Sequence, residues 1–259
     1  MPVPLSLSNK VALVTGGSRG IGAATVRLFV QAGARVMFNY QRAQAQADAL
    51  VKKLGEQAAA VSCDLSGLES ARTLVEETVH RFGRLDILVA NHGIWPPNDA
   101  PVDRLTDTQW QKTIAVNLDS VFSLVRYSVA RMKKQHQLDP QPSHIVLVSS
   151  TAGQRGEAFH ADYAATKGAL ISMVKGLSTE LAPDQIYINC VAPGWVDTEM
   201  SQPALNDPTT RDTILAKIPI GRAASAEEIA GPILFLCTPL AGFITGEIFN
   251  VNGGAVLVG

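Results

Sequence analysis

Short apolar runs alternate with longer segments of helical period along the whole chain, and this alternation is the strongest constraint on the fold. The short runs are rich in β-branched and aliphatic residues, which predicts strands buried on both faces. Alternating strands and helices predict parallel strands joined by right-handed crossovers, and therefore a single α/β domain over residues 1–259 with a doubly wound sheet between helices. The expected strands are 11–15, 35–39, 58–62, 85–90, 144–149, 186–191 and 247–251, and the expected helices are 20–32, 43–54, 67–82, 107–134, 161–182 and 225–237.

Three of these helices carry start signals. Ser225 with Glu228, and Thr106 with Gln109, have the spacing of a capping box, in which the hydroxyl of the first residue accepts from the backbone N–H of the residue three positions later. Ser66 is expected to cap the helix that follows Leu65.

Composition excludes several classes of partner. A formal net charge of −1 without a run of five like charges gives no polybasic surface for nucleic acid or anionic lipid. No apolar run approaches the roughly 20 residues that span a bilayer, and residues 1–10 lack a leader pattern, so the expected location is the cytoplasm. The three cysteines Cys63, Cys190 and Cys237 are far apart and form no C-x-x-C pair, so neither a disulfide framework nor a metal site is predicted.

The first expected strand runs directly into a glycine-rich turn, TGGSRGIG, from Thr15 to Gly22. Glycines let a ligand approach the backbone closely, and the N-terminus of the following helix favours anions. The order of strand, turn and helix therefore predicts a phosphate site. Its spacing, Gly16-x-x-x-Gly20-x-Gly22, differs from the common dinucleotide pattern G-x-G-x-x-G.

Tyr163 and Lys167 lie one turn apart on the same face of an expected helix. An ammonium beside a phenol lowers the phenol's pKa from its usual value of about 10, which would make Tyr163 a general acid or base. The alternative is a tyrosine packed in the core beside a lysine that reaches solvent.

Further motifs are consistent with the first interpretation. They are NHG at 91–93, Asn117 within IAVNLDS, Ser150 thirteen residues before Tyr163, YAATK at 163–167, PGWVDT at 193–198 and GEIFNVNGG at 246–254. With these motifs the chain resembles, over nearly its whole length, the single-domain short-chain dehydrogenase/reductase family. The resemblance implies a Rossmann-like fold with about seven parallel strands, a nicotinamide cofactor, and a homotetramer or dimer.

The resemblance also implies roles for four residues. Tyr163 would donate a proton to a carbonyl in reduction, or act as the base in alcohol oxidation. Lys167 would lower the pKa of Tyr163 and bind the nicotinamide ribose, and Ser150 would hold the substrate oxygen. Asn117 would complete a water-linked proton relay through Lys167.

The cofactor is predicted to be NADP(H) rather than NAD(H). Sites for NAD usually place an acidic residue after the second strand, and none follows residues 35–39. Arg19 and Arg42 are suited to a 2′-phosphate, although both can also be solvated surface residues. The resemblance makes Asp64 an adenine contact, and His92, where many relatives have alanine, a loop histidine near the cofactor. The full set of expected cofactor contacts is Gly16, Ser18, Arg19, Gly20, Ile21, Gly22, Asn39, Tyr40, Arg42, Asp64, Leu65, Asn91, Gly93, Tyr163, Lys167, Pro193, Gly194, Val196 and Thr198.

Loops beyond strand ends are expected to shape the substrate pocket, and the segment at about 195–222 is expected to form a lid. Large apolar side chains in these loops predict moderately apolar walls. They are Trp95, Phe159, Trp195 and Met200.

Within the family, the motifs are most similar to those of 3-oxoacyl-[acyl-carrier-protein] reductases. This implies hydride transfer between NADP(H) and a 3-oxoacyl thioester, with an acyl carrier protein as partner. However, Pro183, Asp184 and Gln185 stand where those reductases often present basic residues. A general carbonyl reductase, or a sugar or alcohol dehydrogenase, is the alternative. A non-catalytic NADP(H) sensor would be expected to lack the catalytic tyrosine, lysine or serine, and all three are present.

Overall fold

The computed structural model describes residues 5–258, so both end positions of the predicted domain lie outside the described part of the chain. Within that range seven parallel strands form a single sheet, as the sequence predicted, and their order in the sheet is β3-β2-β1-β4-β5-β6-β7. The strands are β1 (Val11–Val14), β2 (Arg35–Tyr40), β3 (Ala58–Ser62), β4 (Ile87–Ala90), β5 (Ser143–Val148), β6 (Ile186–Pro193) and β7 (Ile248–Val251).

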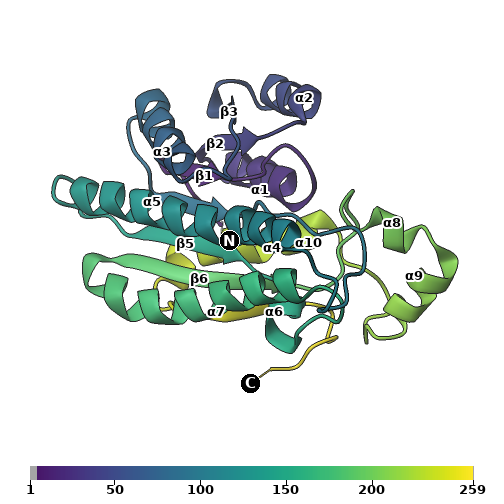
Figure 1. Cartoon of the computed structure of the whole chain (residues 1–259). Helices are drawn as coiled ribbons and strands as arrows, with labels where there is room; N and C mark the ends of the chain where they lie inside the picture. Colours follow the sequence, from purple (N-terminus) through teal and green to yellow (C-terminus); the bar gives the residue numbers. More distant parts are fainter. Residues whose placement is uncertain (1–4, 259) are drawn as a thin grey trace.

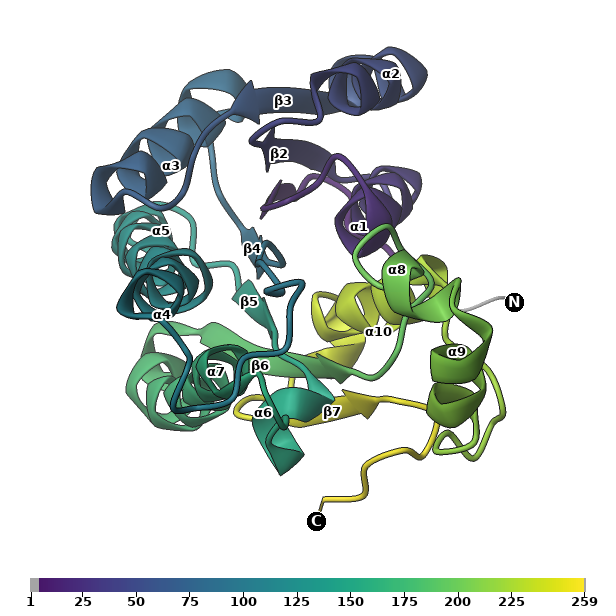
Figure 2. The same ribbon diagram turned by 45° about the vertical axis from the view of Figure 1, so that its right-hand side comes forward.

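Helices cover both faces of this sheet (Figures 1 and 2). They are α1 (Gly20–Gln31), α2 (Gln44–Leu54), α3 (Leu68–Phe82), α4 (Asp107–Ile114), α5 (Ser120–His136), α6 (Thr151–Arg155), α7 (Ala161–Leu181), α8 (Gln202–Leu205), α9 (Pro208–Leu215) and α10 (Ala226–Leu236). Side chains alternate along each strand, so Ala12 and Val14 pack into one apolar layer with α1 and α10, whereas Val11 and Leu13 pack into the other with α3, α5 and α7.

The expected helix 107–134 is interrupted. Between α4 and α5 the residues Ala115–Asp119 form a π-helical turn. Such turns are rare in proteins as a whole, but many of those that occur lie at functional sites. Here the turn contains Asn117.

The helix caps agree with the sequence in part. Ser225 and Glu228 form the reciprocal capping box, with bonds of 3.2 and 2.8 Å. Thr106 accepts from the backbone of Gln109 at 3.2 Å, but the Gln109 side chain binds elsewhere.

The prediction that Ser66 caps α3 is wrong. The helix begins at Leu68, so the cap position falls to Gly67, which has no side chain to accept a hydrogen bond. Ser66 instead lies in a tight turn before the helix, where its backbone N–H donates to the Asp64 carboxylate at 2.9 Å.

The order of the strands also locates the place where a ligand would bind. β1 lies between β2 and β4, so the chain leaves β1 toward one side of the sheet and returns to its other side. In open α/β sheets ligands bind at such a switch point, outside the carboxyl ends of the strands. None of the helices in residues 5–258 is long and apolar enough to cross a membrane.

Candidate active site

The glycine turn after β1 has a backbone that depends on its glycines. Gly16 and Gly20 have φ angles of +62° and +50°, a region that other residues rarely adopt. A Cβ on Gly22 would overlap the carbonyl oxygen of Gly16 and lie 2.7 Å from the side-chain nitrogen of Asn91. Because α1 begins at Gly20, its N-terminus faces the turn, which forms a cradle suited to a phosphate group.

Residues from three further segments contact this turn. Asn39, in β2, accepts from the backbone N–H of Gly16 at 2.8 Å. Asn91, after β4, donates to the carbonyl oxygens of Thr15 and Gly16 at 3.0 and 3.4 Å. The methyl group of Thr198, after β6, lies 3.2 Å from the position of a Cβ on Gly20. The sequence-predicted contacts from β2, β4 and β6 are thus brought together.

The predicted contacts beyond the turn differ in exposure. Arg19 and Arg42 are exposed, and so is Asp64, whereas Leu65 is buried. Arg42 follows β2 and Asp64 follows β3, and they lie near each other because the last residues of these strands, Tyr40 and Ser62, are paired. The pKa of Asp64 is lowered, first by the hydrogen bonds from Ser66 and in a smaller part by the positive charge of Arg42. The other predicted contacts are buried or half-buried: Ser18, Ile21, Tyr40, Gly93, Pro193, Gly194 and Val196.

Ser150, Tyr163 and Lys167 meet at the carboxyl end of β5. Ser150 caps α6, and its hydroxyl accepts from the backbone N–H of Ala152 at 3.1 Å. Tyr163 and Lys167 lie in α7, with only 8% and 4% of their surfaces exposed. The Lys167 ammonium donates to the carbonyl oxygen of Val148 at 2.8 Å, and it lies 5.7 Å from the centre of the Tyr163 ring.

Burial dominates the ionisation of this pair. It raises the pKa of Tyr163 to about 12, against a lowering by a hydrogen bond with Ser150, and it lowers the pKa of Lys167 to about 8. The sequence-based expectation that Lys167 lowers the pKa of Tyr163 is therefore not met, because the ammonium is directed to the Val148 carbonyl and the phenol is desolvated. At neutral pH Tyr163 is therefore protonated, and Lys167 lies close to the pH range in which it titrates.

Asn117 reaches the same place from the π-helical turn. Its side chain donates to the carbonyl oxygen of Ile94 at 2.9 Å and accepts from the N–H of the same residue at 2.8 Å. Gly93 lies between the two functional side chains, since a Cβ there would be 3.3 Å from Asn117 Oδ1 and 3.5 Å from Lys167 Nζ. All four predicted catalytic residues are consequently gathered beside the glycine turn.

An aromatic pair borders Tyr163. The rings of Trp95 and His160 stack with centroids 4.0 Å apart, and Trp95 meets the Tyr163 ring edge-on at 4.6 Å. His160 Nε2 lies 3.0 Å from the carbonyl oxygen of Pro96, which fixes the ring. Trp95 was expected as a wall of the pocket, but sequence reasoning missed His160, whose only signal was its place three residues before Tyr163.

The other expected walls are less enclosed. Phe159 is 53% exposed and Met200 is 53% exposed, whereas Trp195 is half-buried. Met200 belongs to the expected lid at about 195–222, which contains α8 and α9 and projects from the body beside α1 and α10 (Figure 2).

Comparison with known proteins gives consistent matches. Residues 16–256 match the family described as Enoyl-(Acyl carrier protein) reductase. The chain is 37% identical over 253 residues to the 3-oxoacyl-[acyl-carrier-protein] reductase of Aquifex aeolicus, covering 96% of this chain and 98% of that protein. It is 37% identical over 255 residues to the enzyme of the same name from Escherichia coli, covering 98% of this chain and 100% of that protein.

Solved structures agree with these matches. A short-chain dehydrogenase/reductase from Brucella melitensis, described as a glucose/ribitol dehydrogenase, has a TM-score of 0.89 at 35% identity and covers 99% of this chain and 100% of its own. A 3-ketoacyl-(acyl-carrier-protein) reductase from the same organism, complexed with NADH, has a TM-score of 0.89 at 31% identity and covers 97% of this chain and 100% of its own.

Proposed function

Because the chain belongs to the short-chain dehydrogenase/reductase family, we propose that it reduces a 3-oxoacyl thioester to the 3-hydroxyacyl product with NADPH. At the coarser level it is an oxidoreductase of CH–OH groups that uses a nicotinamide cofactor. The observation that carries the proposal is the convergence of Ser150, Tyr163 and Lys167, with Asn117, beside the glycine turn.

The chain's own residues fit the cofactor. The turn from Gly16 to Gly22 is packed so closely that a Cβ on Gly22 would overlap the Gly16 carbonyl oxygen, and it lies at the N-terminus of α1, as a pyrophosphate site requires. When bound, the nicotinamide supplies the hydride. We assign cofactor binding to the residues predicted from the sequence. Asp64 and Leu65 would contact the adenine, Asn91 and Gly93 the adjoining ribose, and the segment from Pro193 to Thr198 the nicotinamide.

In this proposal the protein supplies the proton and the position of the carbonyl. Ser150 donates to the substrate oxygen and stabilises the negative charge that develops there. Tyr163, protonated with a pKa of about 12, gives its phenolic proton to the same oxygen. Lys167, with a pKa of about 8, returns a proton to Tyr163, and Asn117 links Lys167 to solvent through water.

The preference for NADP(H) is part of the proposal. Tyr40 ends β2 where an acidic residue would accept from a ribose hydroxyl, and exposed Arg19 and Arg42 border the same region. Two guanidinium groups favour a 2′-phosphate through charge-assisted hydrogen bonds. The NADH in the Brucella complex belongs to that protein, so both cofactors must be compared for this chain.

The thioester substrate is supported by the names of the relatives and by the apolar Trp95 wall beside Tyr163. We propose that residues 195–222 close over it as a lid, that an acyl carrier protein delivers it, and that the reaction takes place in the cytoplasm. Residues Pro183 to Gln185 do not speak against docking of the carrier, because they lie far from the proposed reaction centre. Tyr163 is near the start of α7, whereas these residues follow its end, and a helix of 21 residues is about 30 Å long.

A sugar or secondary alcohol is the second candidate substrate. One specific observation favours it: the Brucella structure with the higher identity, 35%, is the one described as a glucose/ribitol dehydrogenase.

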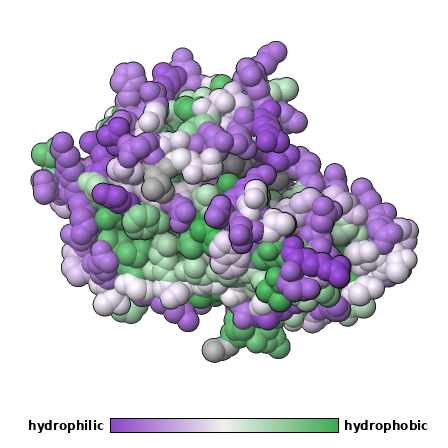
Figure 3. Space-filling view, viewed as in Figure 1, coloured by the Kyte–Doolittle hydropathy of each residue, from purple (hydrophilic) through white to green (hydrophobic). Residues whose placement is uncertain are grey.

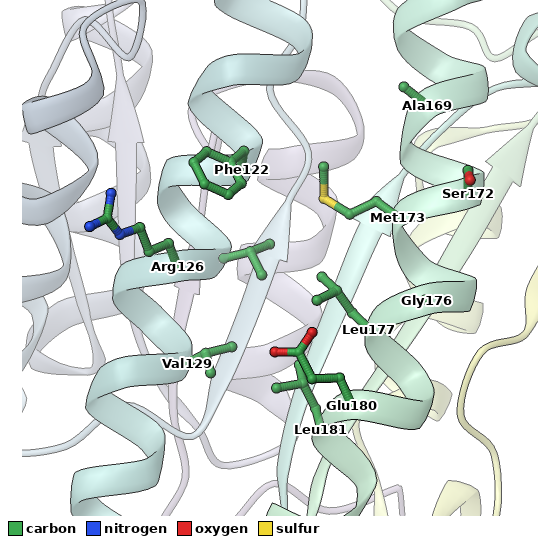
Figure 4. A pocket seen from close by; sticks show the side chains of 11 residues that line it. Phe122, Arg126, Val129, Ala169, Ser172, Met173, Gly176, Leu177, Glu180 and Leu181 are labelled. Atoms are coloured by element: carbon green, nitrogen blue, oxygen red, sulfur yellow. The ribbon is translucent and has the colours of Figure 1, made fainter.

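We also propose that the protein is a homotetramer or dimer that pairs through α5 and α7. A groove between these helices is lined by Phe122, Met173 and Leu177, with Arg126 and Glu180 on opposite helices (Figure 4). The space-filling view shows an apolar strip on this face (Figure 3). Arg126 and Glu180 carry opposite charges, so this face combines an apolar strip with groups that can pair between two copies.

The oligomer is tested by light scattering. The variant Phe122→Asp is expected to lower the molecular mass, whereas Leu138→Asp, which is 88% exposed in a loop, is the control. A wild-type monomer would contradict the proposed assembly.

The function is tested by the initial rate of NADPH oxidation with acetoacetyl-coenzyme A, with NADH in parallel. We expect turnover that is selective for NADPH. Turnover with glucose, ribitol or other alcohols and oxidised cofactor, but none with the thioester, would replace the first substrate by the second. Equal rates with both cofactors would contradict the assignment of Arg19 and Arg42.

A further inference from the structure

His92 lies between the glycine turn and the π-helical turn, and each of its ring nitrogens makes a hydrogen bond. Nδ1 is 2.7 Å from the hydroxyl of Thr15, the last residue before the glycines. Nε2 is 2.7 Å from the hydroxyl of Ser120, the residue that follows the π-helical turn. The proton transfers described above do not use this ring.

The shorter contact of each hydroxyl favours one direction for each hydrogen bond. Ser120 gives its only hydroxyl proton to the carbonyl oxygen of Val116 at 2.6 Å and then accepts from His92, which puts the ring proton on Nε2. The Thr15 hydroxyl is 2.7 Å from Nδ1 but 3.4 Å from its other acceptor, the Val89 carbonyl oxygen. Nδ1 then accepts from Thr15, whose oxygen accepts from the backbone N–H of Asn91 at 3.0 Å. Desolvation lowers the pKa of His92 to about 4, so the ring is neutral at neutral pH.

Both ends of this chain of hydrogen bonds lie beside functional groups. At one end, a Cβ on Gly16 would lie 3.2 Å from the Cβ of His92, so the residue packs against the glycine turn. At the other end, Val116 directly precedes Asn117, whose side chain holds Ile94 by two hydrogen bonds. His92 and Ile94 belong to one short segment, which is therefore fastened to the π-helical turn at two points.

We propose that His92 is a positioning residue that fixes the turn bearing Asn117 relative to the glycine turn, so that the proton relay stays aligned with the cofactor site. His92 touches no reacting atom and acts through Asn117 and Lys167. The inference rests on the proposed function of this site.

The chain offers a matched control. His136, at the end of α5, is also bonded at both nitrogens, to the Asp184 carbonyl at 2.8 Å and the Ser143 hydroxyl at 2.9 Å. It joins α5 to the start of β5, at the edge of the sheet opposite the candidate site. A histidine that only stabilises the fold should behave like His136.

The experiment compares kcat and KM for His92→Ala, Ser120→Ala, the double variant and His92→Gln. Because Ser120 acts through His92, we expect each single alanine variant to lower kcat about fivefold or more with KM changed less than about twofold, and the double variant to be no slower than the slower single one. His92→Gln, whose amide can donate to Ser120, should recover at least about half of the lost kcat. His136→Ala should lower Tm without changing kcat.

An unchanged kcat in His92→Ala, or losses in the double variant that multiply, would overturn the proposal. If His92→Ala does not fold, the kcat of Ser120→Ala decides. Nitrogen-15 NMR of the histidine rings gives a readout without turnover, and the proposal requires an Nε2-protonated, neutral His92. If the wild type reduces no carbonyl, the proposed function fails, and the positioning role of His92 fails with it. An Nδ1-protonated His92 in an active enzyme would overturn the positioning role alone.

Discussion

The ammonium of Lys167 lies 5.7 Å from the centre of the Tyr163 ring and donates to the carbonyl oxygen of Val148 rather than to the phenol. Burial raises the pKa of Tyr163 to about 12 and lowers that of Lys167 to about 8. In the proposed mechanism the two side chains therefore have different roles, because Tyr163 holds a proton at neutral pH and Lys167 returns one to it.

This relationship predicts the pH dependence of reduction. Lys167 returns the proton that Tyr163 gives away only while it is itself protonated. The value of kcat for carbonyl reduction should therefore be level below pH 8 and should fall as the pH rises through about 8. Steady-state rates across that range check this, and a kcat that rises through pH 8 would contradict it.

Arg19 and Arg42 should determine the preference for NADPH. Since charge-assisted bonds to a 2′-phosphate are lost with either guanidinium, Arg19→Ala and Arg42→Ala should each raise the KM for NADPH about tenfold and leave that for NADH within about twofold. Arg72→Ala is the control, because Arg72 is exposed on α3 and pairs with Glu69 and Glu76. Equal effects on both cofactors would place the phosphate elsewhere.

Gly22 should tolerate no side chain. In Gly22→Ala the new Cβ would overlap the Gly16 carbonyl oxygen, so the turn must move and the cofactor should bind at least about tenfold more weakly. Fluorescence titration with NADPH measures this. Gly231→Ala in α10, where a Cβ meets nothing within 4 Å, should bind as the wild type does. Wild-type affinity in Gly22→Ala would rule out this turn as the phosphate site.

Buried His144 should make the protein sensitive to acid. Burial lowers its pKa to about 4 from an ordinary value of about 6.5, with Lys10 adding to the shift. A histidine whose folded pKa is depressed stabilises the fold above about pH 6.5, and this contribution is lost as the pH falls toward 4, by an amount on the order of 3 kcal/mol.

Urea unfolding at pH 7 and near pH 4 measures this loss. His144→Gln should lose less stability between the two pH values than the wild type does. His80→Gln, at an exposed position of α3, should lose as much as the wild type. Identical losses in all three proteins would show that His144 does not cause the acid sensitivity.

The sequence was sufficient to predict the strand and helix order and the set of side chains gathered at the carboxyl ends of the strands. It did not predict the π-helical turn, because one inserted residue leaves the apolar spacing of residues 107–134 almost unchanged. It also missed α9, although Asp207 and Pro208 are a helix start signal, and the segment was interpreted as a lid loop.

The contacts of individual side chains could not be predicted from the sequence, because they depend on tertiary packing. Burial and the bond to Val148 decide the ionisation of Tyr163 and Lys167, and both depend on the packing of β5 against α7. Likewise, the stacking of His160 on Trp95 joins segments 65 residues apart in the sequence, which no local pattern reports.

The turnover of Tyr163→Phe shows most directly whether Tyr163 donates the proton, because this substitution removes the proposed donor and keeps the ring against Trp95. Tyr127→Phe is the matched control, since its hydroxyl only meets Glu69 at 3.3 Å on the surface. We predict that Tyr163→Phe lowers kcat for acetoacetyl-coenzyme A about 100- to 10,000-fold with a far smaller change in the Kd for NADPH, and that Tyr127→Phe changes neither. Wild-type turnover in Tyr163→Phe would contradict the account.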